Sequence, residues 1–274
     1  MRTSYASTKA GGCGSGVPAA MMAIRSRRGR RSHECVLLLL LAASAHAGLP
    51  QELWPLQADA AAIKLHLAAG KSLEPELWPA VQFQGVFCDI LAGTPPEKWR
   101  GELEGFLKPA TKDFVAHGVA DVARVWLARA QMVEVDAVLK NYYRQHVAFP
   151  DTLAPVLKDL PENLRVDPWG QPWVYTLHAP EGFARQTNQR YQLGPTRCPL
   201  LAGLREAIRS RPPQAVPWKI TVETVSGERS LMFKAKKTSA LIQPGGTVDG
   251  YALLFIGDKW ALLAAQDQLF TVAF

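Results

Sequence analysis

The residues that could carry acid–base or metal chemistry are scattered along this chain. After residue 47 its histidines are His66, His117, His146 and His178. None lies in an H-E-x-x-H zinc motif, and the chain contains neither a G-x-S-x-G nucleophile turn nor a Gly-rich phosphate-binding loop. Asp136 precedes a lysine by four residues, a spacing typical of a solvated ion pair on a helix. These patterns predict a protein that is not an enzyme.

Two cysteines, Cys88 and Cys198, lie far apart in the chain after residue 47. Isolated cysteines lack the paired spacing of a zinc site, so we expect no bound metal and no cofactor. Two interpretations stay open for them. Either they form one disulfide, or each is a small buried hydrophobic side chain.

The formal net charge of +7 suggests a nucleic-acid or membrane partner, but the charges are unevenly distributed. Seven of the 31 Lys and Arg residues and one of the 24 acids lie in residues 1–47, which leaves 24 bases and 23 acids in the remaining chain. A nearly neutral chain offers no basic surface to phosphate groups. We therefore expect no nucleic-acid partner.

Residues 1–47 have the three parts of a secretory signal peptide. A basic stretch runs from Arg25 to Arg31, an apolar run from Val36 to Leu41, and a small-x-small cleavage site ends at Ala47. The apolar run is shorter than the roughly 20 residues that span a bilayer. We expect Sec-type export to the periplasm or another extracytoplasmic compartment, with no transmembrane segment after cleavage. The alternative is an uncleaved membrane anchor.

The elements expected in the first half of the mature chain are helical. Residues 48–118 have a mostly helical pattern, and a long helix is expected from about 112 to 146. It should end before Phe149-Pro150, because proline disfavours helical geometry in the residue before it. Arg129 and the other charged residues of this helix are expected to lie largely outside one apolar stripe. The residues of the stripe recur at three- and four-residue steps: Val115, Val119, Val122, Trp126, Ala130, Val133 and Ala137.

Strands are expected in the second half. Two lie near 173–177 and 190–193, a helical stretch follows at 200–210, and a proline-rich linker occupies 211–215. Residues 218–225 alternate apolar with polar side chains, and further strands are expected at 231–236, 251–256, 260–264 and 269–274. Residues 216–274 are therefore predicted to form a small all-β module of five or so strands. The sequence thus predicts an α+β protein with an N-terminal helical region at 48–118, a central domain at 119–210 and a C-terminal β module at 216–274.

Three segments follow one another in a specific order within the central domain. They are A-R-A-Q at 128–131 leading to F-P-D-T-L at 149–153, then D-P-W-G-Q-P-W-V-Y at 167–175, then Y-Q-L-G-P at 191–195. Through these segments residues 119–199 resemble the soluble domain of the major pseudopilin of type II secretion, GspG. The resemblance implies a long helix packed on a small antiparallel sheet.

Nine residues of these segments make up a candidate structural motif. Asp167 can accept hydrogen bonds from the backbone ahead of it, and Pro168 presets φ at the first corner of a turn. Trp169 supplies a large apolar wedge, and Gly170 can adopt a positive φ. We expect the whole set to shape the fold rather than bind a ligand: Phe149, Pro150, Asp167, Pro168, Trp169, Gly170, Pro172, Tyr175 and Gly194.

Two features depart from the pseudopilin pattern. The long helix is preceded by F-V-A-H-G at 114–118 instead of a prepilin-peptidase site and a hydrophobic filament helix. Where the family binds calcium through aspartates, this chain has Thr196 and Arg197, and a cation disfavours a site of hard oxygen ligands. The family's calcium site is therefore expected to be lost.

A second resemblance lies in the C-terminal module. G-T-V-D-G-Y at 246–251, followed by I-G-D at 256–258 and Leu262, is similar to the small β domain of GspC and PilP. Trp218 to Val225 is expected to be an exposed docking edge, unless the strands close into a barrel.

Together the two resemblances imply an exported structural or adaptor component of a type II secretion or type IV pilus-like system that binds machinery proteins. The alternative is a stand-alone periplasmic binding or structural protein with a borrowed pseudopilin-like fold.

Overall fold

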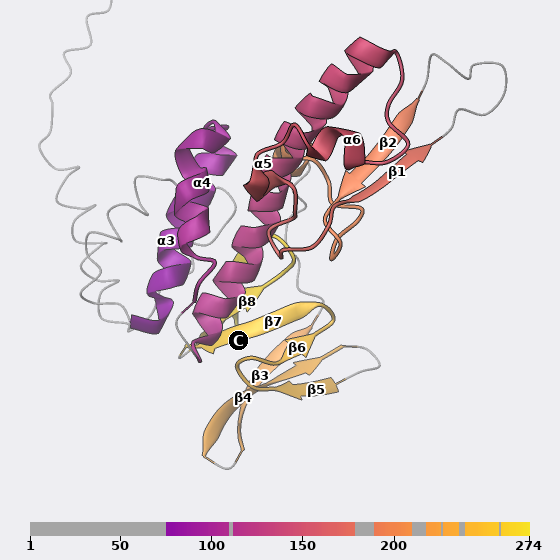
Figure 1. Cartoon of the computed structure of the whole chain (residues 1–274). Helices are drawn as coiled ribbons and strands as arrows, with labels where there is room; N and C mark the ends of the chain where they lie inside the picture. The colour runs from indigo at the N-terminus through magenta and orange to yellow at the C-terminus, as the bar shows by residue number, and fades with distance from the viewer. Residues whose placement is uncertain are drawn as a thin grey trace, which may run out of the picture. The chain divides into compact units, whose positions relative to one another are not determined.

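The computed structural model describes residues 75–109, 112–178, 189–209, 218–225, 227–235, 239–257 and 259–274 (Figure 1). All of these residues belong to one compact unit within Ala43–Phe274. The predicted signal peptide and the predicted 211–215 linker lie outside the described residues.

Helices lie in the described part of each segment predicted to be helical, whereas residues 48–74 of the predicted helical region lie outside the described residues. The helices are the 3-10 turn η3 (Pro75–Leu77), α3 (Trp78–Leu91), α4 (Pro96–Gly105), α5 (Phe114–His146), α6 (Ala154–Leu157), the 3-10 turn η4 (Glu162–Leu164) and α7 (Leu204–Arg209). No helix among the described residues is both long and apolar enough to cross a membrane.

Helix α5, drawn in magenta in Figure 1, is the predicted long helix. Asp113 caps its first turn, because one carboxylate oxygen accepts hydrogen bonds from the backbone N–H groups of Val115 and Ala116. The helix ends at His146, and Val147 adopts a left-handed conformation with φ of 58°. The chain then enters the Phe149-Pro150 segment, as the sequence predicted.

The single apolar stripe predicted on α5 is correct only in its first half. Val133 and Ala137 are exposed, whereas Val135 and Leu139 are buried. Arg129, predicted to lie outside the stripe, is also buried. The reason is that α5 packs against different partners along its length, so the buried side of the helix changes after residue 130.

Two strands form the small antiparallel sheet expected next to the long helix. β1 (Val174–His178) pairs with β2 (Arg190–Gly194), and Val174 lies opposite Gly194 in the register. These strands begin and end within one residue of the predicted ranges. The sheet contacts the C-terminal part of α5 through a hydrophobic cluster that contains Leu139, Trp173 and Leu193.

The described residues after 217 form seven strands in two sheets, more than the five or so predicted. β3 (Lys219–Val225), β4 (Glu228–Lys234) and β5 (Ser239–Ile242) form one antiparallel sheet in that order. β6 (Thr247–Val248), β7 (Tyr251–Ile256), β8 (Trp260–Ala264) and β9 (Leu269–Ala273) form the other. The two strands missed by the sequence, β5 and β6, are the shortest and too brief to show an alternating pattern.

The four-stranded sheet is buried on both faces. Leu254 and Leu262 belong to a cluster with α3, α4 and the N-terminal part of α5, whereas Leu253 and Leu263 belong to a cluster with the three-stranded sheet. Burial on both faces explains the unbroken apolar runs Y-A-L-L-F-I and W-A-L-L-A in β7 and β8. The hydrophobic clusters therefore cross the boundaries that the sequence placed at residues 118 and 216. The described fold is a mixture of helices and small antiparallel sheets around one long helix.

Candidate functional site

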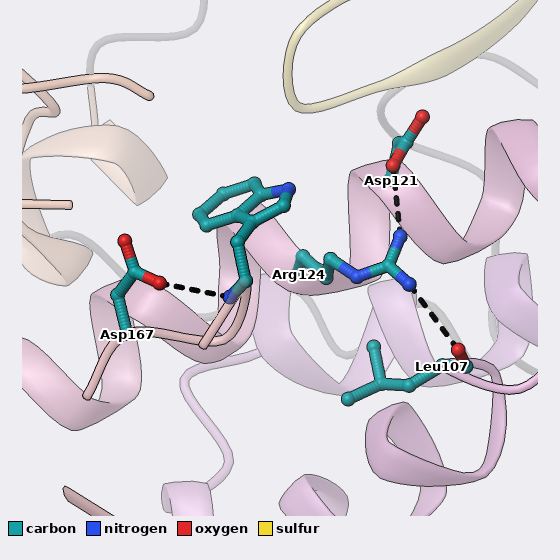
Figure 2. Close-up of polar contacts among 5 residues, drawn as sticks. Leu107, Asp121, Arg124 and Asp167 are labelled. Atoms are coloured by element: carbon teal, nitrogen blue, oxygen red, sulfur yellow. Dashed lines mark hydrogen bonds and ion pairs between the residues drawn. The ribbon is translucent and has the colours of Figure 1, made fainter. Parts of the chain in front are cut away.

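Asp167 is the centre of the turn that the sequence singled out. Its buried carboxylate accepts hydrogen bonds from the backbone N–H groups of Trp169 and Gln171, both at 2.9 Å, and from that of Thr196 at 3.1 Å. The Asp167 carbonyl also accepts from the Gly170 N–H at 2.8 Å, which closes a turn with Pro168 at its first corner. Figure 2 shows the bond to the backbone of residue 169. One side chain thus fastens its own turn and the segment after β2.

Gly170, Trp169 and Trp173 have different roles in and beside this turn. Gly170 is the fourth residue of the turn and has φ of 75°, a left-handed conformation that glycine adopts readily. Trp173 is the fully inserted ring, since it is buried and its Nε1 donates to the Leu164 carbonyl at 2.9 Å. Trp169, which the sequence predicted to be the apolar wedge, is only partly buried, and the Arg197 guanidinium lies 5.8 Å from its ring centroid.

Thr196 and Arg197, the predicted substitutes for calcium ligands, lie beside this turn. The Thr196 hydroxyl donates to the Pro172 carbonyl at 2.7 Å, and its N–H is bound by Asp167. Gly194 is buried next to Pro199, whose carbonyl oxygen would lie 2.3 Å from a Cβ at that position. The second and third predicted segments are therefore brought together by the β1–β2 pairing and by hydrogen bonds between side chains and backbone.

A cluster of aromatic rings collects the remaining motif residues at the C-terminal end of α5. Phe149 lies edge to face with Tyr191, with ring centroids 4.7 Å apart, and Tyr191 lies 5.7 Å from Tyr175. The Tyr175 hydroxyl donates to the Pro150 carbonyl at 2.8 Å. Burial, with a smaller contribution from the charge of Asp151, raises the pKa of Tyr175 to about 12. This hydrogen bond ties the first predicted segment to the second.

Tyr191 also connects the cluster to α5. Its hydroxyl donates a hydrogen bond to Asp136, whose other oxygen lies 2.5 Å from Lys140 Nζ. Burial and the Asp136 carboxylate raise the pKa of Tyr191 above its ordinary value. The Asp136–Lys140 pair that the sequence predicted is present, and its carboxylate also anchors β2 to the helix.

Cys88 and Cys198 are not brought together. Cys88 is buried in α3, whereas Cys198 packs against the cluster around Trp173, and no disulfide joins these two described residues. Cys88 is buried and Cys198 is partly buried in this structure.

Arg129 makes a set of contacts that sequence reasoning missed. The residue is 4% exposed, and its guanidinium lies 4.3 Å from the Trp126 ring centroid. Its Nε donates to the Ala202 carbonyl at 3.2 Å, and its Nη2 lies 2.6 Å from Asp267 Oδ2. The Trp126 Nε1 donates to the Asp267 carbonyl at 2.8 Å. These bonds fasten the β8–β9 turn to the middle of α5.

Arg124 connects α5 to the segment that follows α4. Its Nη1 pairs with Asp121 at 2.8 Å, and its Nη2 donates to the Leu107 carbonyl at 3.2 Å (Figure 2). This places the segment after α4 against α5. Two arginines of α5 thus bind neighbouring segments: Arg124 binds the segment after α4, and Arg129 binds the turn between β8 and β9.

Strand β3 is an edge of its sheet. It pairs with β4 over all seven of its residues, and its other side pairs with no described residue. Trp218, at its start, donates from Nε1 to Asp249 at 3.0 Å and lies edge to face with Phe233 and Tyr251. Strand β3 is thus paired on one side only among the described residues, and its role as a docking edge stays a prediction.

A cleft of about 970 Å³ lies where the start of α5 meets β4, β7 and the segment after β5. Its walls include the half-exposed ring of Phe114 and the charged residues Glu76, Lys112, Glu228 and Arg229. No group of three or more His, Cys, Asp or Glu side chains within the described ranges is placed to hold a metal ion. The cleft thus combines one aromatic ring with charged side chains of both signs.

Comparison with models of known protein families, with curated proteins and with solved structures finds no match for this chain. Its function must therefore be argued from its own residues.

Proposed function

We propose that this protein is an exported, non-enzymatic structural or adaptor component of a type II secretion or type IV pilus-like system, and that it acts through protein–protein contacts. The observation that carries the proposal is the Asp167 turn. The pseudopilin-like segments, which are distant in the sequence, meet at this turn and at the adjoining Tyr175–Tyr191 pair. A set of residues that only shapes the fold suits a protein that works by presenting surfaces.

The surface in this proposal is the open edge of β3. An unpaired strand edge presents backbone N–H and C=O groups in a row, and such a row can bind an extended strand of another chain. In each of the two C-terminal sheets the first and last strands are not paired with each other, and β3 is the end strand of the three-stranded sheet. This arrangement favours docking over a closed barrel. Export by the predicted 1–47 signal peptide would bring this edge to the periplasm or another extracytoplasmic compartment.

Chemical cross-linking followed by affinity purification from the organism that makes the protein tests the proposal. The tagged full-length chain should enrich named components of a secretion or pilus system. An unrelated exported protein with the same tag is the control, and equal enrichment with both baits would contradict the proposal. N-terminal sequencing of the exported protein should give Gly48 as the first residue.

The alternative of a stand-alone periplasmic binding protein is favoured by one observation, the cleft beside Phe114. Native mass spectrometry of the protein purified from its own cells tests it. A bound small molecule that is lost in Phe114→Ala, but retained in Leu241→Ala on the exposed side of β5, would support the binding protein.

A further inference from the structure

The free side of β3 has a defined set of backbone groups. β3 and β4 are joined by the two residues 226 and 227, with Val225 opposite Glu228. A two-residue turn closes with a hydrogen bond between its flanking residues, and hydrogen-bonded pairs then alternate along an antiparallel ladder. The odd-numbered residues of β3 therefore direct their backbone groups toward β4. Ile220, Val222 and Thr224 direct theirs to the open side.

We propose that this edge binds β3 of a second copy of the same chain, antiparallel, about a two-fold axis at Thr221. In this register Lys219 lies opposite Glu223 of the second copy, and Ile220 lies opposite Val222 of the second copy. The outward-facing residues meet as hydrogen-bonded pairs, as an antiparallel ladder requires. Lys219, Thr221 and Glu223 form the close, non-hydrogen-bonded pairs, where cross-strand charges and Thr–Thr contacts favour pairing.

Neighbouring two-fold registers of the same edge are less favourable. An axis at Val222 places Lys219 opposite an apolar residue, Val225, and leaves Glu223 opposite Thr221. An axis at Glu223 places two carboxylates directly opposite each other, which destabilises the pair. Only the Thr221 axis matches opposite charges on one face and apolar side chains on the other.

Two features of the single chain favour the same pairing. Lys219 lies opposite Lys234 in its own sheet, and neither Lys219 nor Glu223 forms an ion pair with another described residue. A carboxylate of the second copy would offset the repulsion between the two lysines. Val222 is 36% exposed, although its cross-strand neighbour Leu231 is 0% exposed. The apolar face of this sheet is therefore incomplete at β3, and Ile220 of the second copy would extend it.

This inference rests on the proposed function in one respect: it takes the β3 edge as the contact surface and names its occupant. The result is an isologous dimer with a continuous six-stranded sheet across the two copies. The dimer then presents two equivalent copies of each surface that lies outside the β3 contact.

A charge-swap series measured by sedimentation equilibrium tests the dimer. The purified wild-type protein should dimerise reversibly, and Glu223→Lys or Lys219→Glu should each weaken self-association by about tenfold or more, because two pairs change from attractive to repulsive. Mixing these two single variants should restore dimers, since each Glu then faces a Lys. The double variant K219E/E223K should dimerise alone.

Each outcome decides the proposal. Circular dichroism of each variant confirms the fold, and Glu228→Lys, at the far side of the hairpin turn, controls for the change in net charge. A wild-type protein that stays monomeric at all concentrations overturns the proposal, as does a dimer that is insensitive to both single variants or a mixture that fails to associate. Enrichment of secretion components by cross-linking is measured separately, so the adaptor proposal can fail while the dimer stands, or the reverse.

Discussion

Arg129 Nη2 and Asp267 Oδ2 lie 2.6 Å apart and connect the middle of α5 to the turn between β8 and β9. The arginine is buried, its Nε donates to the Ala202 carbonyl, and its guanidinium lies over the face of the Trp126 ring. A buried charge without its partner is costly, so this pair makes the attachment of the β sheet to the helix specific rather than merely apolar.

Asp267→Ala should lower the free energy of unfolding by about 3 kcal/mol, because it leaves the Arg129 guanidinium buried without a counter-charge. Arg129→Met keeps an apolar stem over Trp126 and should cost less than Asp267→Ala. Urea denaturation of both variants measures this. Asp121→Ala is the matched control: it removes the exposed partner of Arg124 and should change the stability by about 0.5 kcal/mol. Equal losses for Asp267→Ala and Asp121→Ala would contradict the role of the buried pair.

Gly118 allows β7 to approach α5. A Cβ at this position would lie 2.4 Å from Leu254 Cδ2, within the buried cluster. Gly118→Ala should therefore destabilise the protein by about 1–3 kcal/mol through overpacking, although alanine favours a helix. Gly101→Ala, in the exposed face of α4 with open space around it, should instead stabilise by about 0.5–1 kcal/mol. Thermal melts of the two variants should shift in opposite directions, and shifts of the same sign would count against close packing at Gly118.

The Asp167 carboxylate should hold its turn together. Asp167→Ala removes the acceptor of three backbone N–H groups and should cost about 3 kcal/mol. Asp167→Asn should cost roughly half as much, since an amide oxygen can still accept from Trp169 and Gln171 while its NH₂ group faces the Thr196 N–H. Unfolding in urea with tryptophan fluorescence as the signal measures both. An unchanged midpoint for Asp167→Ala would show that the turn is held by other contacts.

The elements were easier to predict than the surfaces between them. The strands β7 and β8 match the predicted ranges residue for residue, because their apolar runs are bounded by glycine and polar turns. The turn chemistry of Asp167 and Gly170 was also readable, because it depends on neighbours in the sequence. Arg129 was misread because its partner Asp267 is 138 residues away. A charged residue within an otherwise helical pattern predicts solvent exposure unless its distant counter-charge is known.

The change of buried face along α5 had the same origin. A stripe extrapolated from Val115 to Trp126 continues to Val133, but that half of the helix packs on a second cluster around Trp173. Similarly, the β module looked separable because a proline-rich segment precedes it, whereas Leu254, Leu262 and Leu269 complete the cluster around Trp126. Periodicity reports which residues an element buries against one partner and carries no information on how many partners it has.

Tyr175 should make the stability of the protein depend on pH in the alkaline range. Its pKa is raised to about 12 in the folded protein, chiefly by burial, against about 10 for an unfolded tyrosine. The neutral phenol therefore favours the folded state fully below pH 10, and this contribution is lost as the pH rises from about 10 to 12. Tyr175→Phe should flatten the decline in stability over this interval. At neutral pH it should cost about 1 kcal/mol, because the hydrogen bond to the Pro150 carbonyl is lost.

Urea unfolding at pH 8 and at several points up to pH 12, with phenolate absorbance recorded in parallel, measures both effects. Tyr143→Phe leaves the Tyr175 hydroxyl in place and controls for the loss of one phenol. The raised pKa of Tyr191 gives the variant some residual dependence. A Tyr175→Phe profile that falls as steeply as the wild type would refute the assignment.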